Sequence, residues 1–146
     1  MKFFLILDKE QEPSVTVVCD KVTRAVSQIE ALCKEEGADN EILYGYAEDE
    51  VLPLELDAIT CFFTRDGRVF ARINGKDYSV KLRIKQVMEL VDASFMKINQ
   101  GCVANVARIK KFSVSFGGAL RVIFDDGYSD YVSRRELGQV KRRLGL

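Results

Sequence analysis

The sequence contains no histidine. This absence excludes the Ser-His and Cys-His pairs of nucleophilic catalysis, and it removes the side chain that most often serves as a general base near neutral pH. Carboxylates or lysine could still catalyse a reaction, but no motif in the sequence indicates one. We therefore expect that the protein is not an enzyme.

Signals for a metal site are also absent. The four cysteines, Cys19, Cys33, Cys61 and Cys102, form no Cys-x-x-Cys pair, and no histidine can complete a zinc set. Their apolar neighbours predict four reduced and buried thiols. We expect no metal and no cofactor.

Membrane and nucleotide signals are missing as well. No apolar run approaches the ~20 residues of a membrane span, and the apolar residues 3–7 lead into Asp8 without a signal-peptide cleavage site. Gly117-Gly118 precedes a strand-like run, whereas a glycine-rich phosphate loop would precede a helix. These observations predict a cytoplasmic protein without a small-molecule substrate.

Charge is balanced overall but unevenly distributed along the chain. Residues 1–60 carry 5 basic and 14 acidic side chains, and residues 61–146 carry 17 basic and 8 acidic side chains. The two parts therefore have net charges of −9 and +9. A basic region of this kind suits the neutralisation of nucleic-acid phosphates.

The N-terminal part has the pattern of two strands and a helix. Apolar runs predict strands over residues 3–7 and 15–19, and Val22, Val26 and Ile29 recur at helical spacing. Asp20 is the expected N-cap of this helix, and Gly37 is its expected end. An acidic, turn-rich stretch predicts a linker near residues 45–51, which divides the chain into a β-β-α element (1–50) and a second domain (51–146).

The second domain is predicted to be mainly β. Asp66-Gly67, Asn74-Gly75, Gly117-Gly118 and Asp126-Gly127 are dipeptides typical of tight hairpin turns, and the runs between them alternate as half-buried strands do. One short helix is expected within residues 82–91. A final helix is expected from Ser133, because Ser133 and Glu136 have the spacing with which each side chain caps the other's backbone amide.

Two segments carry the most specific pattern, FMKINQGCVANVARIKKF (residues 95–112) and DYVSRRELGQVKRRL (residues 130–144). They combine an aromatic strand start, a short polar stretch, a Val-x-Asn step, an Ile-Lys-Lys strand and a terminal Ser-Arg-Arg. This combination resembles the LytTR family of bacterial DNA-binding domains. The resemblance covers residues 51–146.

The resemblance implies an α+β, mainly β fold: an elongated bundle of short antiparallel sheets with a short helix and a C-terminal helix, preceded here by the β-β-α element. It also implies contact with DNA through three loops instead of a recognition helix. Gln100 and Arg135 would read base edges in the major groove, since amides pair with adenine and arginine pairs with guanine. The implied DNA-binding residues are Arg68, Lys97, Asn99, Gln100, Ser133, Arg134, Arg135 and Lys141.

The chain also departs from the family pattern. Members often carry a basic triplet such as His-Arg-Ser where this chain has Asn99-Gln100-Gly101, and often a histidine where it has Gly67-Arg68. Simpler explanations also exist for individual residues. Asn105 fits a buried amide that satisfies backbone groups, and Arg135 fits a solvated charge paired with Asp130 or Glu136.

The leading interpretation is a regulator of transcription that binds specific duplex DNA as a dimer on repeated sites. A receiver domain is not expected within the first 50 residues, and the resemblance implies a small membrane protein as a possible inhibitory partner. The alternative is a protein-interaction module that keeps the fold but binds DNA weakly or not at all. The acidic segment could restrain the basic one or simply maintain solubility.

Overall fold

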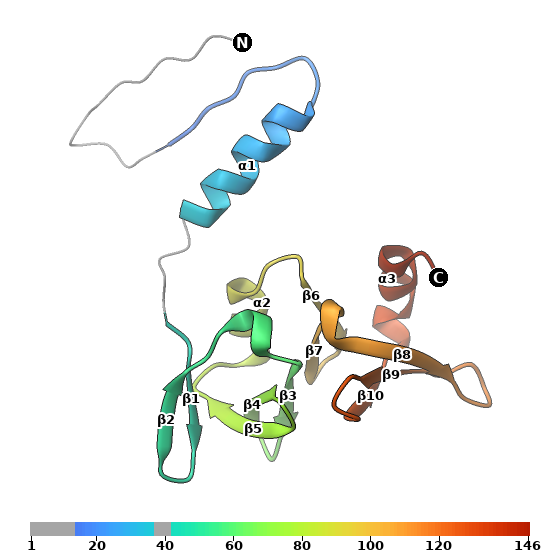
Figure 1. The fold of residues 1–146 in the computed structure, drawn as a ribbon. Coiled ribbons are helices and arrows are strands. Elements are labelled where there is room, and N and C mark those ends of the chain that lie inside the picture. Colours follow the sequence, from blue (N-terminus) through green and yellow to red (C-terminus); the bar gives the residue numbers. More distant parts are fainter. Residues whose placement is uncertain (1–13, 37–41) are drawn as a thin grey trace. The chain divides into compact units, whose positions relative to one another are not determined.

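The computed structural model describes residues 14–36 and 42–146, which belong to two compact units that divide between Glu41 and Ile42. In the first unit, helix α1 (Arg24–Glu36) confirms the helix predicted from the apolar spacing (Figure 1). The hydroxyl of Thr23 accepts a hydrogen bond from the Val26 amide at 3.4 Å. Thr23 therefore caps the helix, and the expectation of Asp20 as N-cap is wrong.

The strand expected over residues 15–19 is also wrong. Residues 14–19 form no strand, and every side chain from residue 14 to residue 25 is exposed. A strand is stable only when a neighbour completes its hydrogen-bond ladder, and the described part of this unit offers no such neighbour. The strand expected over residues 3–7 and the helix end at Gly37 lie outside the described residues.

The second unit is built from two antiparallel sheets and two helices (Figure 1). Its mainly β composition, with a short helix and a C-terminal helix, confirms the expected fold class. Among the described residues, no helix is long and apolar enough to cross a membrane. The seven-stranded sheet has the order β2-β1-β5-β4-β3-β7-β6, and the three-stranded sheet has the order β10-β9-β8. The elements are β1 (Tyr44–Ala47), β2 (Glu50–Pro53), the 3₁₀ turn η1 (Leu56–Ala58), β3 (Cys61–Arg65), β4 (Arg68–Ile73), β5 (Lys76–Val80), α2 (Ile84–Leu90), β6 (Phe95–Asn99), β7 (Cys102–Asn105), η2 (Val106–Arg108), β8 (Ile109–Val114), β9 (Leu120–Phe124), β10 (Ser129–Tyr131) and α3 (Arg134–Leu144).

The linker expected near residues 45–51 is a hairpin of the large sheet instead. Strands β1 and β2 pair over four residues, and Tyr46 of β1 pairs with Ser79 of β5. The acidic residues that suggested a linker form the turn of this hairpin, since a β-turn and a linker share the same polar composition. The expected boundary at residues 50 and 51 therefore falls inside the hairpin.

The glycine-containing dipeptides form the turns predicted for them. Backbone φ is positive at both residues of Asp66-Gly67 (52° and 73°) and of Asn74-Gly75 (50° and 79°). Two consecutive residues of this kind characterise the type I′ turn, whose twist matches that of paired strands. Gly117, Gly118 and Gly127 also have positive φ.

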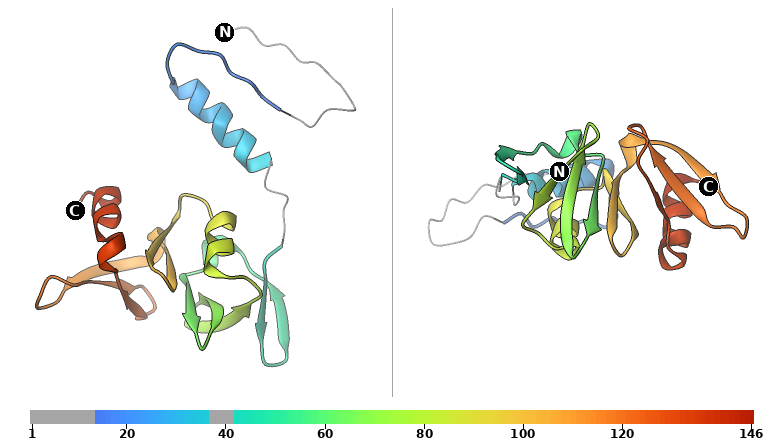
Figure 2. Two further views of the ribbon diagram at one scale, coloured as in Figure 1. Left: turned by 180° about the vertical axis from the view of Figure 1, so that it is seen from behind. Right: turned by 90° about the horizontal axis from the view of Figure 1, so that it is seen from below.

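Strand β3 alternates between two separate hydrophobic cores. Cys61 and Phe63 belong to the first core, which the large sheet shares with the small sheet and α3, whereas Phe62 belongs to the second core under α2. The neighbouring strand β7 is buried at all four positions. The large sheet is therefore covered on both faces where β3 and β7 run, as Figure 2 shows from two further directions.

The cysteines divide between the two units. Cys61 and Cys102 are buried in the first core, as expected, but Cys19 and Cys33 are exposed, so the expectation is wrong for them. No described residue of the first unit forms a core that could bury them. The hydrogen bond between the two buried thiols and burial itself raise the pKa of Cys102 well above its ordinary value, which keeps it protonated.

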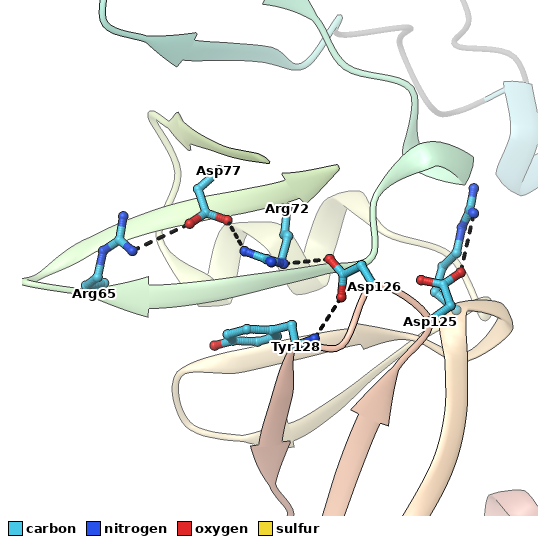
Figure 3. A network of polar contacts seen from close by, with 7 residues as sticks. Arg65, Arg72, Asp77, Asp125, Asp126 and Tyr128 are labelled. Atoms are coloured by element: carbon cyan, nitrogen blue, oxygen red, sulfur yellow. Dashed lines mark hydrogen bonds and ion pairs between the residues drawn. The ribbon is translucent and has the colours of Figure 1, made fainter. Parts of the chain in front are cut away.

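A polar junction joins the two sheets at Arg72 of β4 (Figure 3). Its Nε donates to Asp126, in the β9–β10 turn, at 2.6 Å, and its Nη1 donates to Asp77 of β5 at 2.9 Å. The guanidinium also lies over the Tyr128 ring at 5.0 Å, and that ring packs against Phe63 at 5.3 Å. The carboxylates are largely buried, with exposed side-chain fractions of 12% for Asp126 and 21% for Asp77.

We expect Arg72→Ala to lower the free energy of unfolding by about 2–3 kcal/mol, because it leaves the largely buried Asp126 carboxylate without a cation and leaves Asp77 with only its longer pair to Arg65. Urea denaturation followed by circular dichroism measures the change. Lys76→Ala is the matched control, because the Lys76–Glu50 pair is more than half exposed and such pairs contribute little. Equal effects of the two substitutions would contradict the role assigned to the junction.

Candidate nucleic-acid interface

Strand register brings the first two predicted loops to one end of the large sheet. Phe63 of β3 pairs with Cys102 of β7, and the Thr64 amide donates to the Gly101 carbonyl at 2.8 Å. The β3–β4 turn at Asp66-Gly67 follows directly after β3, and the β6–β7 turn at Gln100-Gly101 directly precedes β7. Both turns therefore lie at the same sheet end, although more than 30 residues separate them along the chain.

Hydrogen bonds join the second loop to the third. Asn99 donates from its side-chain amide to the Tyr131 carbonyl at 2.8 Å and to the Asp130 carboxylate at 3.1 Å. The backbone amide of Ser133 donates to the Ile98 carbonyl at 2.8 Å. These three bonds fix the start of α3 beside the β6–β7 turn.

Asn99 and Gln100 occupy different environments within the second loop. Besides its two donated bonds, Asn99 accepts a bond from the Gly101 amide at 2.9 Å, so its side chain is engaged on both its oxygen and its nitrogen. Gln100 is exposed, and its side chain forms no hydrogen bond with any described residue. In this arrangement Asn99 shapes the loop, whereas Gln100 is available to a ligand.

Ser133 caps α3 as expected, with its hydroxyl accepting from the Glu136 amide at 3.3 Å. The other bond of the predicted capping box, from the Ser133 amide to the Glu136 side chain, is wrong, because the Ser133 amide donates to the Ile98 carbonyl instead. The helix start is thus held by a strand of the large sheet, which the sequence spacing did not indicate.

Arg134 and Arg135 stand in the first turn of α3, and both are exposed. Neither forms an ion pair with any residue in the described ranges, so the pairing of Arg135 with Asp130 or Glu136 is not observed. Cations near a helix N-terminus oppose the helix dipole. The two arginines therefore do not stabilise the fold, and their position favours an anion as ligand.

The remainder of α3 separates a packed side from a basic side. Val140 is buried, and Leu137 and Leu144 pack against the first core. Lys141 is exposed and lies seven residues after Arg134, which places both on one side of the helix about 10 Å apart. Arg143 donates to the Phe95 carbonyl at 2.8 Å, so it attaches α3 to β6.

The first loop carries cations at the same sheet end. Arg68, the first residue of β4, is exposed and has no ion pair among the described residues, whereas Arg65 pairs with Asp77 at 3.5 Å. Sequence analysis missed Lys81, an exposed residue at this end. The register of the β4–β5 hairpin could have indicated Lys81. Val69 pairs with Val80, so Arg68 and Lys81 are the next residues toward the loop end of the sheet.

Two further sequence expectations concern strands β6 and β7. Lys97 is half-buried and alternates with Met96 and Ile98 of the first core, so it points to the sheet face opposite α3. The structure does not bring Lys97 to the start of α3. Asn105 is 3% exposed and bonds to the Ile59 carbonyl and the Ala107 amide, which confirms its structural role.

One group of acidic side chains of the second unit lies away from the loops, in the β1–β2 turn. Residues 42–146 carry 17 basic and 13 acidic side chains, a net charge of +4, so the +9 counted from residue 61 overstates the charge of the folded unit. The acidic residues that lie between residues 42 and 60 include those of the β1–β2 turn. In that turn, Glu50 pairs with Lys76 near the Asn74-Gly75 turn. That turn lies at the sheet end opposite Asp66-Gly67. Among the described residues, no group of three potential ligands could hold a metal ion.

Comparison with known proteins gives one family for most of the chain. The model of the LytTr DNA-binding domain matches residues 49–145. A LytTr DNA-binding domain from Bacillus cereus has a similar structure, with a TM-score of 0.68 and 16% identity over 73% of this chain and all of that chain. This likeness concerns the fold.

Curated relatives come from Staphylococcus aureus. An uncharacterized HTH-type transcriptional regulator of strain NCTC 8325 is 25% identical over 104 residues, 71% of each chain. A second, from strain MSSA476, is 23% identical over 147 residues, which cover 100% of this chain and 99% of that protein. In the unit from Ile42 to Leu146, strands β6 to β10 separate the two helices, so this unit contains no helix-turn-helix.

We expect Asn99→Ala to lower the free energy of unfolding by about 1–3 kcal/mol, because it removes three hydrogen bonds and leaves their partners unsatisfied. Amide hydrogen exchange at Gly101 should become faster. Gln100→Ala serves as the control and should change neither quantity. Unchanged exchange at Gly101 in Asn99→Ala would show that the loop is held by other contacts.

Proposed function

The chain belongs to the LytTR family of DNA-binding domains, and we propose that it is a transcriptional regulator that reads specific duplex DNA with three loops. The observation that carries this proposal is the meeting of loops from distant parts of the chain around two unpaired arginines at the start of α3. The names of the staphylococcal relatives, which describe transcriptional regulators, support it.

In the proposed complex the loops divide the recognition between them. Arg135 and Gln100 contact base edges in the major groove, because a guanidinium can bond two acceptors of guanine and an amide can bond adenine. Arg68, Arg134 and Lys141 contact phosphates and set the register of the protein on the duplex. Asn99 and Ser133 keep these side chains in place through the bonds to Tyr131 and Ile98. Lys97 contributes only to the general positive field.

The distribution of charge supports the same orientation on DNA. The loops carry unpaired cations, whereas the acidic β1–β2 turn lies at the other end of the large sheet. A duplex is therefore attracted to the loop end and repelled from the opposite one. Phosphate contacts of this kind release counterions, so binding weakens steeply as salt is added.

We also propose that α1 holds two copies of the chain together. Val22 and Leu32 are 75% and 59% exposed, Val26 and Ile29 are half-buried, and none of residues 14–33 is buried. A helix of 13 residues is marginal in water unless its apolar side is covered. A second copy would cover it and would present two basic loop ends to a repeated DNA site.

The proposed location is the cytoplasm, where a bacterial regulator meets DNA. A small membrane protein as inhibitory partner, and restraint of the basic loops by the acidic N-terminal segment, stay predictions. So does the absence of a catalytic activity.

We expect Arg135→Ala to weaken binding to a duplex selected from a random pool by about 1–3 kcal/mol and to relax base preference at one position. Lys141→Ala should weaken binding to all duplexes alike, because it removes only a phosphate contact. Fluorescence anisotropy at several salt concentrations measures both. If wild-type protein selects no duplex, the protein-interaction alternative replaces this proposal.

We expect Val26→Glu and Ile29→Glu to convert a dimer into a monomer of 16.5 kDa, because each places a charge in the apolar side of α1. Ser27→Glu is the control, since Ser27 is exposed and lies between the two positions in the sequence. Light scattering after size exclusion gives the mass. A wild-type chain that is already monomeric at micromolar concentration would contradict the dimer.

A further inference from the structure

The turn between β8 and β9 presents the most exposed aromatic side chain among the described residues. Phe116 has a relative exposure of 108%, and Val114 at the end of β8 is 71% exposed. The turn projects from the small sheet in Figure 1 and Figure 2. Phe116 belongs to neither hydrophobic core, so its aromatic ring stabilises nothing inside the described fold.

The backbone of this turn is ordered by its own hydrogen bonds. Ser115 donates to the Ala119 carbonyl at 2.9 Å, and Gly118 donates to the Ser115 carbonyl at 3.0 Å. Gly117 and Gly118 have φ of 95° and 82°, values that a side chain would disfavour, and open space surrounds both. The turn therefore presents Phe116 on a narrow tip that carries no other bulky side chain.

The tip lies at the same end of the small sheet as the start of α3. Val132 donates to the Leu120 carbonyl at 2.8 Å, and Tyr131 pairs with Arg121. The chain then enters α3 through Ser133, so the cations of the third loop emerge beside the base of the β8–β9 hairpin. Phe116 extends on the order of 7 Å beyond Leu120, given the rise of two strand residues.

Charge identifies the kind of partner that this hairpin fits. Residues 109–124 contain Lys110, Lys111 and Arg121 and no acidic residue. Lys110 and Lys111 are exposed and have no ion pair among the described residues. The hairpin carries an aromatic side chain at its tip and only basic charges, and its tip lies at the same end of the small sheet as the third loop. These features suit a polyanion with stacked bases.

We propose that the β8–β9 hairpin is an additional DNA contact, in which Phe116 inserts between base pairs beside the segment read by Arg135 and bends the duplex. The inference rests on the proposed function. Apolar side chains that enter the minor groove in this way unstack one base step and kink the helix. Arg121 pairs with Ser113 near the tip and would neutralise phosphates beside the inserted ring, whereas Lys110 and Lys111 lie toward the other end of β8 and add to the general positive field.

Two substitutions at one position test the proposal on the full chain. Phe116→Ala should bind the selected duplex about tenfold more weakly and bend it less, as measured by energy transfer between dyes on the duplex ends. Base preference at the position read by Arg135 should stay unchanged. Val51→Ala is the control, because Val51 is 62% exposed on the edge strand β2 and should alter neither quantity.

The second substitution uses the absence of tryptophan from the chain. Phe116→Trp introduces a single reporter, and its emission should shift and become protected from iodide when the specific duplex is added. In the matched control Val51→Trp, the emission should stay accessible to iodide when the duplex is added. Protection of the Phe116→Trp reporter at high protein concentration without DNA would overturn the proposal in favour of a protein contact.

The outcomes separate this inference from the proposed function. If the wild-type chain binds the duplex, Phe116→Ala binds and bends it equally well, and the Phe116→Trp reporter stays accessible in the complex, the hairpin contact alone is overturned. A wild-type chain that binds no duplex overturns both.

Discussion

Burial of β3 and β7 on both faces is the constraint on which the rest of the structure depends. Every residue of β7 is buried, and Cys61, Phe62 and Phe63 of β3 alternate between the two cores. A sheet that is apolar on both sides must be covered twice, by α2 on one side and by the small sheet with α3 on the other. The second cover brings the start of α3 to the end of β6, where the candidate interface forms.

At the candidate interface, two arginines lower the stability of α3, while hydrogen bonds hold the start of that helix in place. Arg134 and Arg135 oppose the dipole of α3 and gain no ion pair within the described residues, so the fold would be more stable without them. The backbone that carries them is nevertheless held in place, because Ser133 and Asn99 attach the helix start to β6. The inter-sheet pair of Arg72 and Asp126 supports the same arrangement from the other end of the small sheet. A site held in advance loses less entropy on binding.

Part of the charge separation lies within the second unit. Counting along the chain places all the early acids in one block, but several of them belong to the folded unit at the β1–β2 turn. The large sheet places the acidic β1–β2 turn at the end opposite the unpaired cations Arg68 and Lys81. An arrangement of this kind orients an approaching polyanion, which a uniform positive charge would not do.

Features that depend on neighbours within a few residues could be predicted from the sequence. The turn dipeptides, the cap at Ser133 and the helical spacing around Val26 each predict an element correctly, and the combined motif predicts the family. Tertiary structure decided the rest. Residues 15–19 have the sequence pattern of a strand but have no partner strand in the described part of their unit. Residues 45–51 have the composition of a linker but form a hairpin that pairs with β5. Asn99 is predicted as a DNA contact, yet its side-chain amide bonds to the Tyr131 carbonyl within the fold. Pairing between distant segments decides these cases, because a backbone or amide group bonds to whatever the packed chain places beside it.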